Sequence, residues 1–429
     1  MTARNILGLI LFTALTLRVL AAVGLTHRLE QNGQDFLIAG DAQGYWELGQ
    51  HIAAGEPYAI LGQTDDPLAK ASIPRQVTRM PGFPALLGLV IRCAGHNLLI
   101  TRLVLALIST LACYLVYQLG LRIHGQHVGL AAAMACAVSP TLVGFSVLVL
   151  SETLFAVLLL ACLIGTAALW PLNPDSTSNP PALPVALPAA NRPARLAVAG
   201  WTGLAACAAV YVRPGWLAAV PLLGLLGIVM SRSRRQATIE AAVVMLVVGL
   251  GLLPWAWRNL KQTSHPVLTT LWVGPSLYDG LRVGATGESD MQFIIDDGLF
   301  ADPQQTEYDI DRHYRSAAWD FVREHPLGTL KLAMIKCWRY LKPWPSARQF
   351  QQPWQLAVVA VPTMLLYLMA LRGAWTYRHE PWTWVLLAFP LLYFAALHTV
   401  FVGSLRYRVP AEFPLWILAA AGYRRRSTS

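Results

Sequence analysis

Long runs of apolar residues, separated by short polar breaks, dominate the chain. Several runs reach the roughly 18 residues that a helix needs to cross the hydrocarbon core of a bilayer. Apolar residues are continuous within each run, and in lipid only helices or closed barrels satisfy the backbone hydrogen-bonding groups. The pattern predicts an all-α polytopic membrane protein with about ten spans, at 5–25, 98–120, 128–149, 151–170, 196–212, 215–231, 237–257, 354–371, 383–402 and 407–422.

Two long segments, 26–97 and 258–353, interrupt the apolar runs. They divide the chain into an N-terminal transmembrane module at 1–257, which includes the first of the two segments, and a C-terminal transmembrane module at 354–429. The second segment lies between these modules. We expect both segments to leave the membrane on the same side, because an even number of spans separates them.

Three shorter helices are expected within the two segments. The stretch 81–94 is apolar but too short to cross the bilayer, which indicates a juxtamembrane or re-entrant helix. The stretch 306–324 mixes charged and aromatic residues and predicts a soluble helix. The stretch 326–341 carries lysine and arginine among leucine, isoleucine and tryptophan, a pattern typical of an amphipathic helix in the membrane interface.

Composition agrees with a membrane protein: 55% of the residues are hydrophobic and 13% are charged, against about 25% charged in soluble domains. The net charge of +10 does not indicate nucleic-acid binding, because the sequence holds no nucleic-acid motif and its basic residues form short groups between apolar runs. On the positive-inside rule these groups predict a cytoplasmic side that includes both termini. The groups are Arg4, Arg122, Arg192, Arg195, Arg232, Arg234, Arg235, Arg372, Arg378, Arg424, Arg425 and Arg426.

Most other ionisable residues near membrane depth fall at the external ends of the expected spans, where such residues are functional candidates. Glu152, Arg213, Arg406 and Arg408 lie there, and the first external segment adds Asp41 and Arg79. Together they offer cations for an anionic headgroup and a carboxylate for proton transfer.

Structural roles remain open for several of these residues. Arg18 and Arg258 also suit anchoring or snorkelling, in which a long basic side chain reaches the interface. Asp41 also suits the N-cap of a helix that begins near Gln43. The charge of Arg213, before Pro214, also suits a marker of the interface.

Six motifs carry a family resemblance. They are Gly40-Asp41-Ala42-Gln43-Gly44-Tyr45-Trp46, Arg79-Met80-Pro81-Gly82-Phe83-Pro84, Ser151-Glu152-Thr153-Leu154-Phe155, Tyr211-Val212-Arg213-Pro214, Pro254-Trp255 with Arg258-Asn259, and Arg406-Tyr407-Arg408-Val409-Pro410. In this order, and on one face of the membrane, they resemble the GT-C class of polyprenyl-phosphate-sugar-dependent glycosyltransferases. The branch they resemble most holds bacterial relatives of protein O-mannosyltransferases and aminoarabinose lipid A transferases. Each motif is weak alone, and the resemblance covers nearly the whole chain.

The resemblance implies that Asp41 is the catalytic acid of the first external loop and that Arg79 contacts the lipid phosphate. We expect Arg406 and Arg213 to help bind that phosphate, and Tyr45, Glu152, Tyr407 and Arg408 to bind or orient substrate. Asp41 would be the general base of an inverting transfer from a polyprenyl-phosphate-sugar to a lipid, glycan or protein acceptor. Many relatives carry two adjacent acids here, whereas Asp41 stands between Gly40 and Ala42, so the use of a divalent metal stays open.

Two other functions stay open. A transporter or flippase of lipid-linked substrates would call for ionisable residues near mid-membrane, broken helices in paired positions and an internal repeat, none of which the sequence shows. A glycan polymerase or ligase with a diphosphate-linked donor would call for more basic residues. The sequence places the protein in a cell membrane, most simply a bacterial inner membrane, with its active site on the external face and membrane lipids around it.

Overall fold

A computed structural model describes residues 2–38, 40–60, 74–169, 192–346, 350 and 352–423. Within these ranges the regular structure is helical, and one isolated antiparallel bridge joins Ile60 to Arg75. The predicted all-α class is confirmed. The terminal arginines Arg424, Arg425 and Arg426 lie outside the described residues.

Helices occupy both halves of the chain. The first half holds α1 (Ala3–Gln31), α2 (Asp41–Ala54), α3 (Gly82–Ala94), α4 (Leu98–His124), α5 (Gln126–Val138), α6 (Pro140–Phe145), α7 (Glu152–Leu169), α8 (Arg192–Val212), the 3-10 helix η2 (Pro214–Trp216) and α9 (Ala219–Met230). The second half holds α10 (Arg234–Thr263), α11 (Val273–Gly280), α12 (Gln292–Asp297), the 3-10 helix η3 (Leu299–Ala301), α13 (Glu307–Glu324), α14 (Pro326–Leu341), α15 (Pro353–Thr376), α16 (Pro381–Thr383), the π-helical turn η5 (Trp384–Ala388), α17 (Phe389–Val400) and α18 (Leu405–Ala421).

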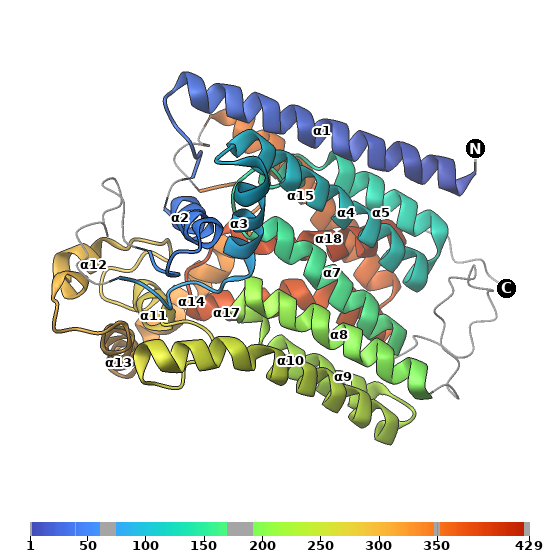
Figure 1. Ribbon diagram of the computed structural model, residues 1–429. Coiled ribbons are helices and arrows are strands. Elements are labelled where there is room, and N and C mark those ends of the chain that lie inside the picture. Colours follow the sequence, from blue (N-terminus) through green and yellow to red (C-terminus); the bar gives the residue numbers. More distant parts are fainter. Residues whose placement is uncertain are drawn as a thin grey trace.

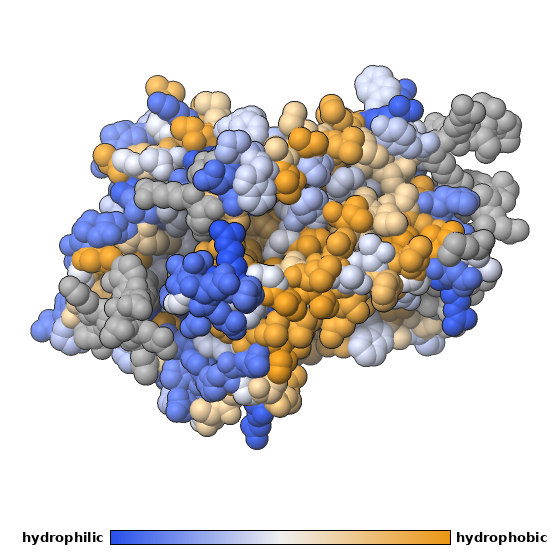
Figure 2. Space-filling model, turned by 90° about the horizontal axis from the view of Figure 1, so that it is seen from above, coloured by the Kyte–Doolittle hydropathy of each residue, from blue (hydrophilic) through white to orange (hydrophobic). Residues whose placement is uncertain are grey.

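Among the described residues, seven helical stretches are long and apolar enough to cross a membrane: α1, α4, α7, α8, α10, α15 and the continuous stretch Pro381–Val400. They run roughly side by side in one bundle, and α2, α11, α12 and α13 gather toward one end of it (Figure 1). On the face seen in Figure 2, hydrophobic residues cover the middle of the bundle and hydrophilic residues gather at that end. The chain is a multi-pass membrane protein.

The expected number of about ten spans is not confirmed. The predicted span 128–149 is broken, because α5 ends at Val138 and α6 is a separate short helix that begins at Pro140. Proline disfavours helical geometry in the residue before it, which is Ser139 here. The predicted span 215–231 corresponds to the short apolar helical stretch Pro214–Met230, and 407–422 corresponds to α18, which has 17 residues.

Arg18 is fully buried, so it does not snorkel to the interface. Its guanidinium group donates to the carbonyl oxygens of Cys136 and Ala137 at 3.1 and 3.0 Å, and to Ser109 Oγ at 2.8 Å. These carbonyl groups belong to the last turn of α5, where helix ends leave acceptors without partners. A buried charge therefore compensates the break between α5 and α6.

Helix α18 lies inside the bundle and packs against α4, α5, α7, α14, α15 and α17. Most of its residues are buried, including Arg408 and Glu412, which form an ion pair at 2.7 Å one helical turn apart. Nearby, α4 and α5 approach closely at Gly120 and Gly129, where a Cβ on Gly129 would lie 2.7 Å from the Tyr117 carbonyl oxygen. Small residues of this kind let membrane helices pack closely.

The three helices expected within the two long segments are present. The stretch 81–94 forms α3, 306–324 forms α13 with Thr306 as its N-cap, and 326–341 forms α14. The short helices α11 and α12 were not predicted, because α11 has eight residues with a proline inside and α12 has six. These elements bring the two long segments to the same end of the bundle (Figure 1).

Candidate active site

Asp41 is the first residue of α2, and it does not cap that helix. The N-cap is Gly40, whose positive φ of 66° suits glycine, and its backbone N–H donates to the side chain of Gln43 at 3.2 Å. The carboxylate of Asp41 is therefore free of the helix backbone and meets two arginines instead. This placement argues against the N-cap interpretation of Asp41.

Arg79 reaches Asp41 from the irregular segment that precedes α3. Its Nη2 group donates to Asp41 Oδ1, and its guanidinium group lies over the ring of Tyr45 at 5.3 Å. Tyr45 lies one helical turn after Asp41 on the same face of α2, as its spacing predicts. The hydroxyl group of Tyr58 donates to the Arg79 carbonyl oxygen at 3.1 Å and fixes the backbone there.

Arg406, in the first turn of α18, joins Asp41 to a second carboxylate. Its Nη1 group donates to Asp41 Oδ2 at 2.6 Å, and its Nε group donates to Glu152 Oε1. Arg213 Nη2 donates to the same Glu152 oxygen at 2.6 Å, and Arg213 Nε donates to Ser151 Oγ at 3.3 Å. Glu152 is the first residue of α7 and is fully buried.

These five residues form a continuous row, Arg79–Asp41–Arg406–Glu152–Arg213, which we call the arginine row. Three guanidinium groups face two carboxylates, so the row keeps one net positive charge. The side chains of Asp41 and Arg79 are 26% and 23% exposed, against 0% for Glu152. The end of the row at Asp41 is therefore the part that a substrate can reach.

Arg79 and Arg406 keep the side chain of Asp41 ionised. Burial by itself raises the pKa of Asp41, but the charges and hydrogen bonds of Arg79 and Arg406 more than offset burial and bring the pKa well below its usual range. Burial also lowers the pKa of Arg79, but the Asp41 carboxylate together with Tyr45 and Tyr407 outweighs burial, so the pKa of Arg79 is raised and both partners stay charged.

An aromatic stack lies against the row. The guanidinium carbons of Arg213 and Arg406 are 5.5 and 5.7 Å from the ring of Tyr407. The ring of His398 stacks on Tyr407 at 4.2 Å, and Tyr340 of α14 stacks on His398 at 5.7 Å. The stack links α14 to the arginine row.

Arg408 is not part of the arginine row. It is fully buried, pairs with Glu412, and donates to the carbonyl oxygens of Tyr340, Leu341 and Lys342 at 3.1, 3.1 and 2.9 Å. These are acceptors at the carboxyl end of α14, which a helix leaves unpaired. The expectation that Arg408 binds or orients substrate therefore does not fit its position, which gives it a structural role in joining α18 to α14.

Two buried polar atoms in the row have no hydrogen-bond partner among the described residues: Arg79 Nε, a donor, and Glu152 Oε2, an acceptor. Within the same residues, no group of three or more His, Cys, Asp or Glu side chains could hold a metal ion. The two carboxylates of the row are each bound to two arginines, a poor donor set for a metal. We therefore derive no step through a metal ion.

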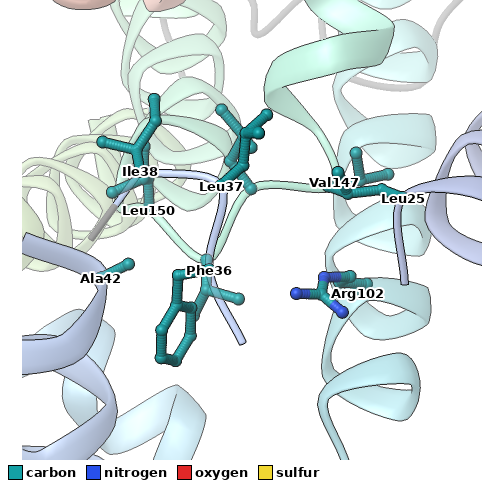
Figure 3. Close-up of a pocket in the computed structure, with 10 residues that line it drawn as sticks. Leu25, Phe36, Leu37, Ile38, Ala42, Arg102, Val147 and Leu150 are labelled. Carbon is teal, nitrogen blue, oxygen red and sulfur yellow. The ribbon is translucent and has the colours of Figure 1, made fainter. Parts of the chain in front are cut away.

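A small apolar pocket lies directly beside α2. Figure 3 shows Phe36, Leu37 and Ile38 on one side of it and Arg102 of α4 on the other, with Ala42 at its edge. Arg102 is 2% exposed and donates to Thr26 Oγ1 at 2.8 Å and to the Asp35 carbonyl oxygen. It thereby ties the end of α1 to the connection that leads to Asp41.

Sequence reasoning did not single out His398 or Glu307. His398 is a lone histidine in an apolar run, and nothing in the pattern separates it from a core residue. Glu307 is an acidic residue at a helix start, where acids are common because of the helix dipole. Glu307 accepts from the backbone beside Arg79, a long-range contact that the sequence does not reveal.

Comparison with known proteins gives matches among solved structures. No protein-family model matches the sequence, and no curated protein matches it. The oligosaccharyltransferase AglB from Archaeoglobus fulgidus, in complex with an inhibitory peptide and a dolichol-phosphate, matches with a TM-score of 0.56 and 13% identity. The alignment covers 98% of this chain and 50% of that protein. The apo form matches with a TM-score of 0.55 and 14% identity, over 95% and 50% of the two chains.

ArnT from Cupriavidus metallidurans bound to undecaprenyl phosphate also matches, with a TM-score of 0.43, 13% identity, and coverage of 98% of this chain and 78% of that one. The chain spans about half the length of the oligosaccharyltransferases that it matches. At these identities the match to AglB shows the fold alone. The GT-C type of fold, which the sequence motifs suggested, is confirmed.

Proposed function

We propose that the protein is a membrane glycosyltransferase that moves a sugar from a polyprenyl-phosphate donor to an acceptor hydroxyl group, with Asp41 as the general base. The observation that carries the proposal is the contact of Asp41 with both Arg79 and Arg406, three residues from separate parts of the chain. The fold supports it, because a protein with this fold has been solved with a dolichol-phosphate.

The arginine row suits a phosphate leaving group. Arg79 and Arg406 can each offer two N–H groups in a plane, which matches phosphate oxygens, and they stay charged at any physiological pH. The free Nε donor of Arg79 and the net positive charge of the row favour an anion at this end. Fixed charges of this kind stabilise the negative charge that develops on the leaving phosphate.

In the proposed step, the acceptor oxygen forms a bond to the anomeric carbon of the sugar. The bond from that carbon to the phosphate oxygen breaks, and its electron pair leaves with the polyprenyl phosphate. The proton of the acceptor hydroxyl passes to Asp41, and the anomeric centre inverts because attack comes from the face opposite the phosphate.

Donor binding would also make Asp41 a stronger base. A carboxylate with a pKa well below its usual range is a weak base, and both oxygens of Asp41 already accept from arginines. A donor phosphate competes for the same N–H groups of Arg79 and Arg406. Their partial release raises the pKa of Asp41 and leaves one oxygen to receive the acceptor proton.

Glu152 holds the row together. One of its oxygens accepts from both Arg406 and Arg213, and because Glu152 is fully buried it acts on the substrate through these two arginines. Tyr407 supports both arginines from one side. Tyr45 supports Arg79 in the same way.

A monophosphate donor fits this site better than a diphosphate donor. Other nearby arginines are bound to the protein: Arg258 donates to the carbonyl oxygens of Gln76 and Tyr58 at 2.7 and 3.0 Å, and Arg408 pairs with Glu412. The row itself keeps one net positive charge.

We further propose that the site opens on the external face, since the arginine groups that predict the cytoplasmic side flank the other ends of the helices.

The proposal is tested by binding of undecaprenyl phosphate to the purified protein in detergent, measured by native mass spectrometry. Arg79→Gln should weaken binding by about tenfold to a hundredfold, because it removes charge-assisted hydrogen bonds to the phosphate. Arg92→Gln is a matched control, since Arg92 is an exposed arginine of the neighbouring helix α3. Equal binding by both variants would argue against the phosphate site.

A further inference from the structure

One carboxylate from the second long segment holds the three residues that precede Arg79. The backbone N–H of Gln76 donates to Glu307 Oε2 at 2.8 Å, and the N–H of Val77 donates to both Glu307 oxygens at 3.1 and 3.2 Å. The hydroxyl group of Thr78 donates to Glu307 Oε1 at 3.1 Å. Glu307 therefore binds three consecutive residues that lie about 230 positions away in the sequence.

Helix α13 does not need Glu307 to begin. Thr306 is its N-cap, and Thr306 and Asp309 form a capping box in which each side chain accepts from the backbone N–H of the other residue. The carboxylate of Glu307 turns away from the helix instead, and the residue is 8% exposed. A buried carboxylate is retained at little cost only when its oxygens are well bound, as they are here.

Further contacts fix the same segment from two other sides. Leu271 N–H donates to the Val77 carbonyl oxygen at 2.9 Å, and Arg258 Nη1 donates to the Gln76 carbonyl oxygen at 2.7 Å. The side chain of Val77 is fully buried against Val267 and Leu271. Residues 76–78 are thus held by Glu307, Arg258 and Leu271, all from 258–353, immediately before Arg79.

We propose that Glu307 is a positioning residue that sets the guanidinium group of Arg79 against Asp41, so that the second long segment takes part in donor binding. The inference rests on the proposed phosphate role of Arg79. A planar guanidinium group binds a phosphate well only in a narrow range of positions, and a shift of about 1 Å at a reacting site has large effects. Glu307 acts on this geometry through the backbone, without touching the substrate.

A double-mutant cycle tests the inference. The affinity for undecaprenyl phosphate is measured for the wild type, Glu307→Ala, Arg79→Gln and the double variant. We expect Glu307→Ala to weaken binding by about tenfold in the wild type and by less than about twofold in the Arg79→Gln background, because residues that act through one contact are not additive. An equal loss in both backgrounds would overturn the inference, since a general structural defect adds to any other change.

Asp309→Ala is the matched control, because it weakens the start of α13 and leaves the contacts of Glu307 in place. It should leave the affinity within about twofold of the wild type. If Glu307→Ala does not fold, Glu307→Gln replaces it in the cycle, since glutamine keeps one acceptor oxygen. A smaller loss of affinity that disappears in the Arg79→Gln background supports the inference. An equal loss of affinity in both backgrounds rejects it.

The cycle also separates this inference from the proposed function. If the wild type does not bind undecaprenyl phosphate, or if Arg79→Gln binds it as well as the wild type, the phosphate site itself is wrong. If Arg79→Gln weakens binding and Glu307→Ala does not, the phosphate site stands and only the role of Glu307 is rejected.

Discussion

At the scale of single residues, arginine has three different uses in this protein. Arg18 and Arg408 are fully buried and bind carbonyl groups at the ends of α5 and α14. Arg258 binds the backbone of the segment before Arg79. Arg79 and Arg406 bind the carboxylate of Asp41, where substrate can reach them. All of these arginines lie within or next to apolar runs, so the pattern alone does not distinguish the uses.

The candidates Asp41, Arg79, Arg406, Glu152 and Arg213 could be chosen from the sequence, and the structure brings all five together. The motifs give their order along the chain but not their pairing. That Arg406 and not Arg408 reaches Asp41 depends on the rotation of α18, which packing sets. The catalytic and binding roles of these residues remain predictions.

Glu152→Gln tests the residue that links Arg406 to Arg213. Glutamine keeps an acceptor oxygen but removes the charge that fixes both guanidinium groups. We expect kcat for sugar transfer to fall by about tenfold or more, while affinity for undecaprenyl phosphate does not fall, since the site gains positive charge. Kinetics in membranes supplied with a labelled lipid-linked sugar would measure both. An unchanged kcat would reject the orienting role.

At the scale of elements, hydrophobic pattern predicts the helices well where they are long or strongly amphipathic. Helices α13 and α14 begin and end within a residue of the expected limits. The pattern fails at α5, where an apolar run hides the break at Pro140, and at α11, which is too short to show a period. In both places tertiary contacts, such as those of Arg18, compensate for what the local sequence lacks.

Helix α14 presents an exposed apolar face at Leu327, Leu330, Met334 and Trp338, which are 82%, 58%, 60% and 57% exposed. We propose that this face lies in the membrane interface, as its sequence pattern indicates. A nitroxide label on Leu330→Cys, in a variant that lacks the native cysteines, should be more accessible to oxygen than to a nickel chelate. Arg323→Cys on α13, 76% exposed, should show the reverse. Equal accessibilities at both sites would contradict the proposal.

Lys336 of α14 gives a prediction about pH. It is fully buried, and its Nζ group donates to the carbonyl oxygens of Gly280 and Val400 at 3.1 and 2.7 Å. Burial lowers its pKa from 10.5 to about 8, and Asp279 offsets part of this effect. Because the folded protein loses this proton at a lower pH than the unfolded chain, the contribution of Lys336 to stability rises as pH increases from about 8 to 10.5.

Relative to Lys336→Met, the wild type should therefore gain about 2 kcal/mol of stability between pH 7.5 and 10. Thermal unfolding in detergent across this pH range measures the difference between the two proteins. Lys331→Met on the exposed side of the same helix is the control and should run parallel to the wild type. If the stability of Lys336→Met changes with pH in parallel with that of the wild type, burial does not govern the protonation of Lys336.

At the scale of the whole molecule, the site is assembled from elements that the chain visits far apart. Segment 26–97 supplies Asp41 and Arg79, α7 supplies Glu152, and α18 supplies Arg406. Segment 258–353 binds the backbone before Arg79 through Glu307 and contacts the row through Tyr340 and its aromatic stack. The multi-pass helical class follows from hydropathy, whereas this convergence depends on the packing of α18 inside the bundle.

The central claim is that Asp41 takes the acceptor proton in sugar transfer. Sugar transfer from a labelled polyprenyl-phosphate donor is therefore measured in membranes that contain the wild type, Asp41→Asn or the control Asp320→Asn, which changes an exposed acid of α13. We expect Asp41→Asn to keep its fold and to lose transfer by about a hundredfold or more, while Asp320→Asn matches the wild type. Transfer by Asp41→Asn at the wild-type rate would show that Asp41 is not the general base.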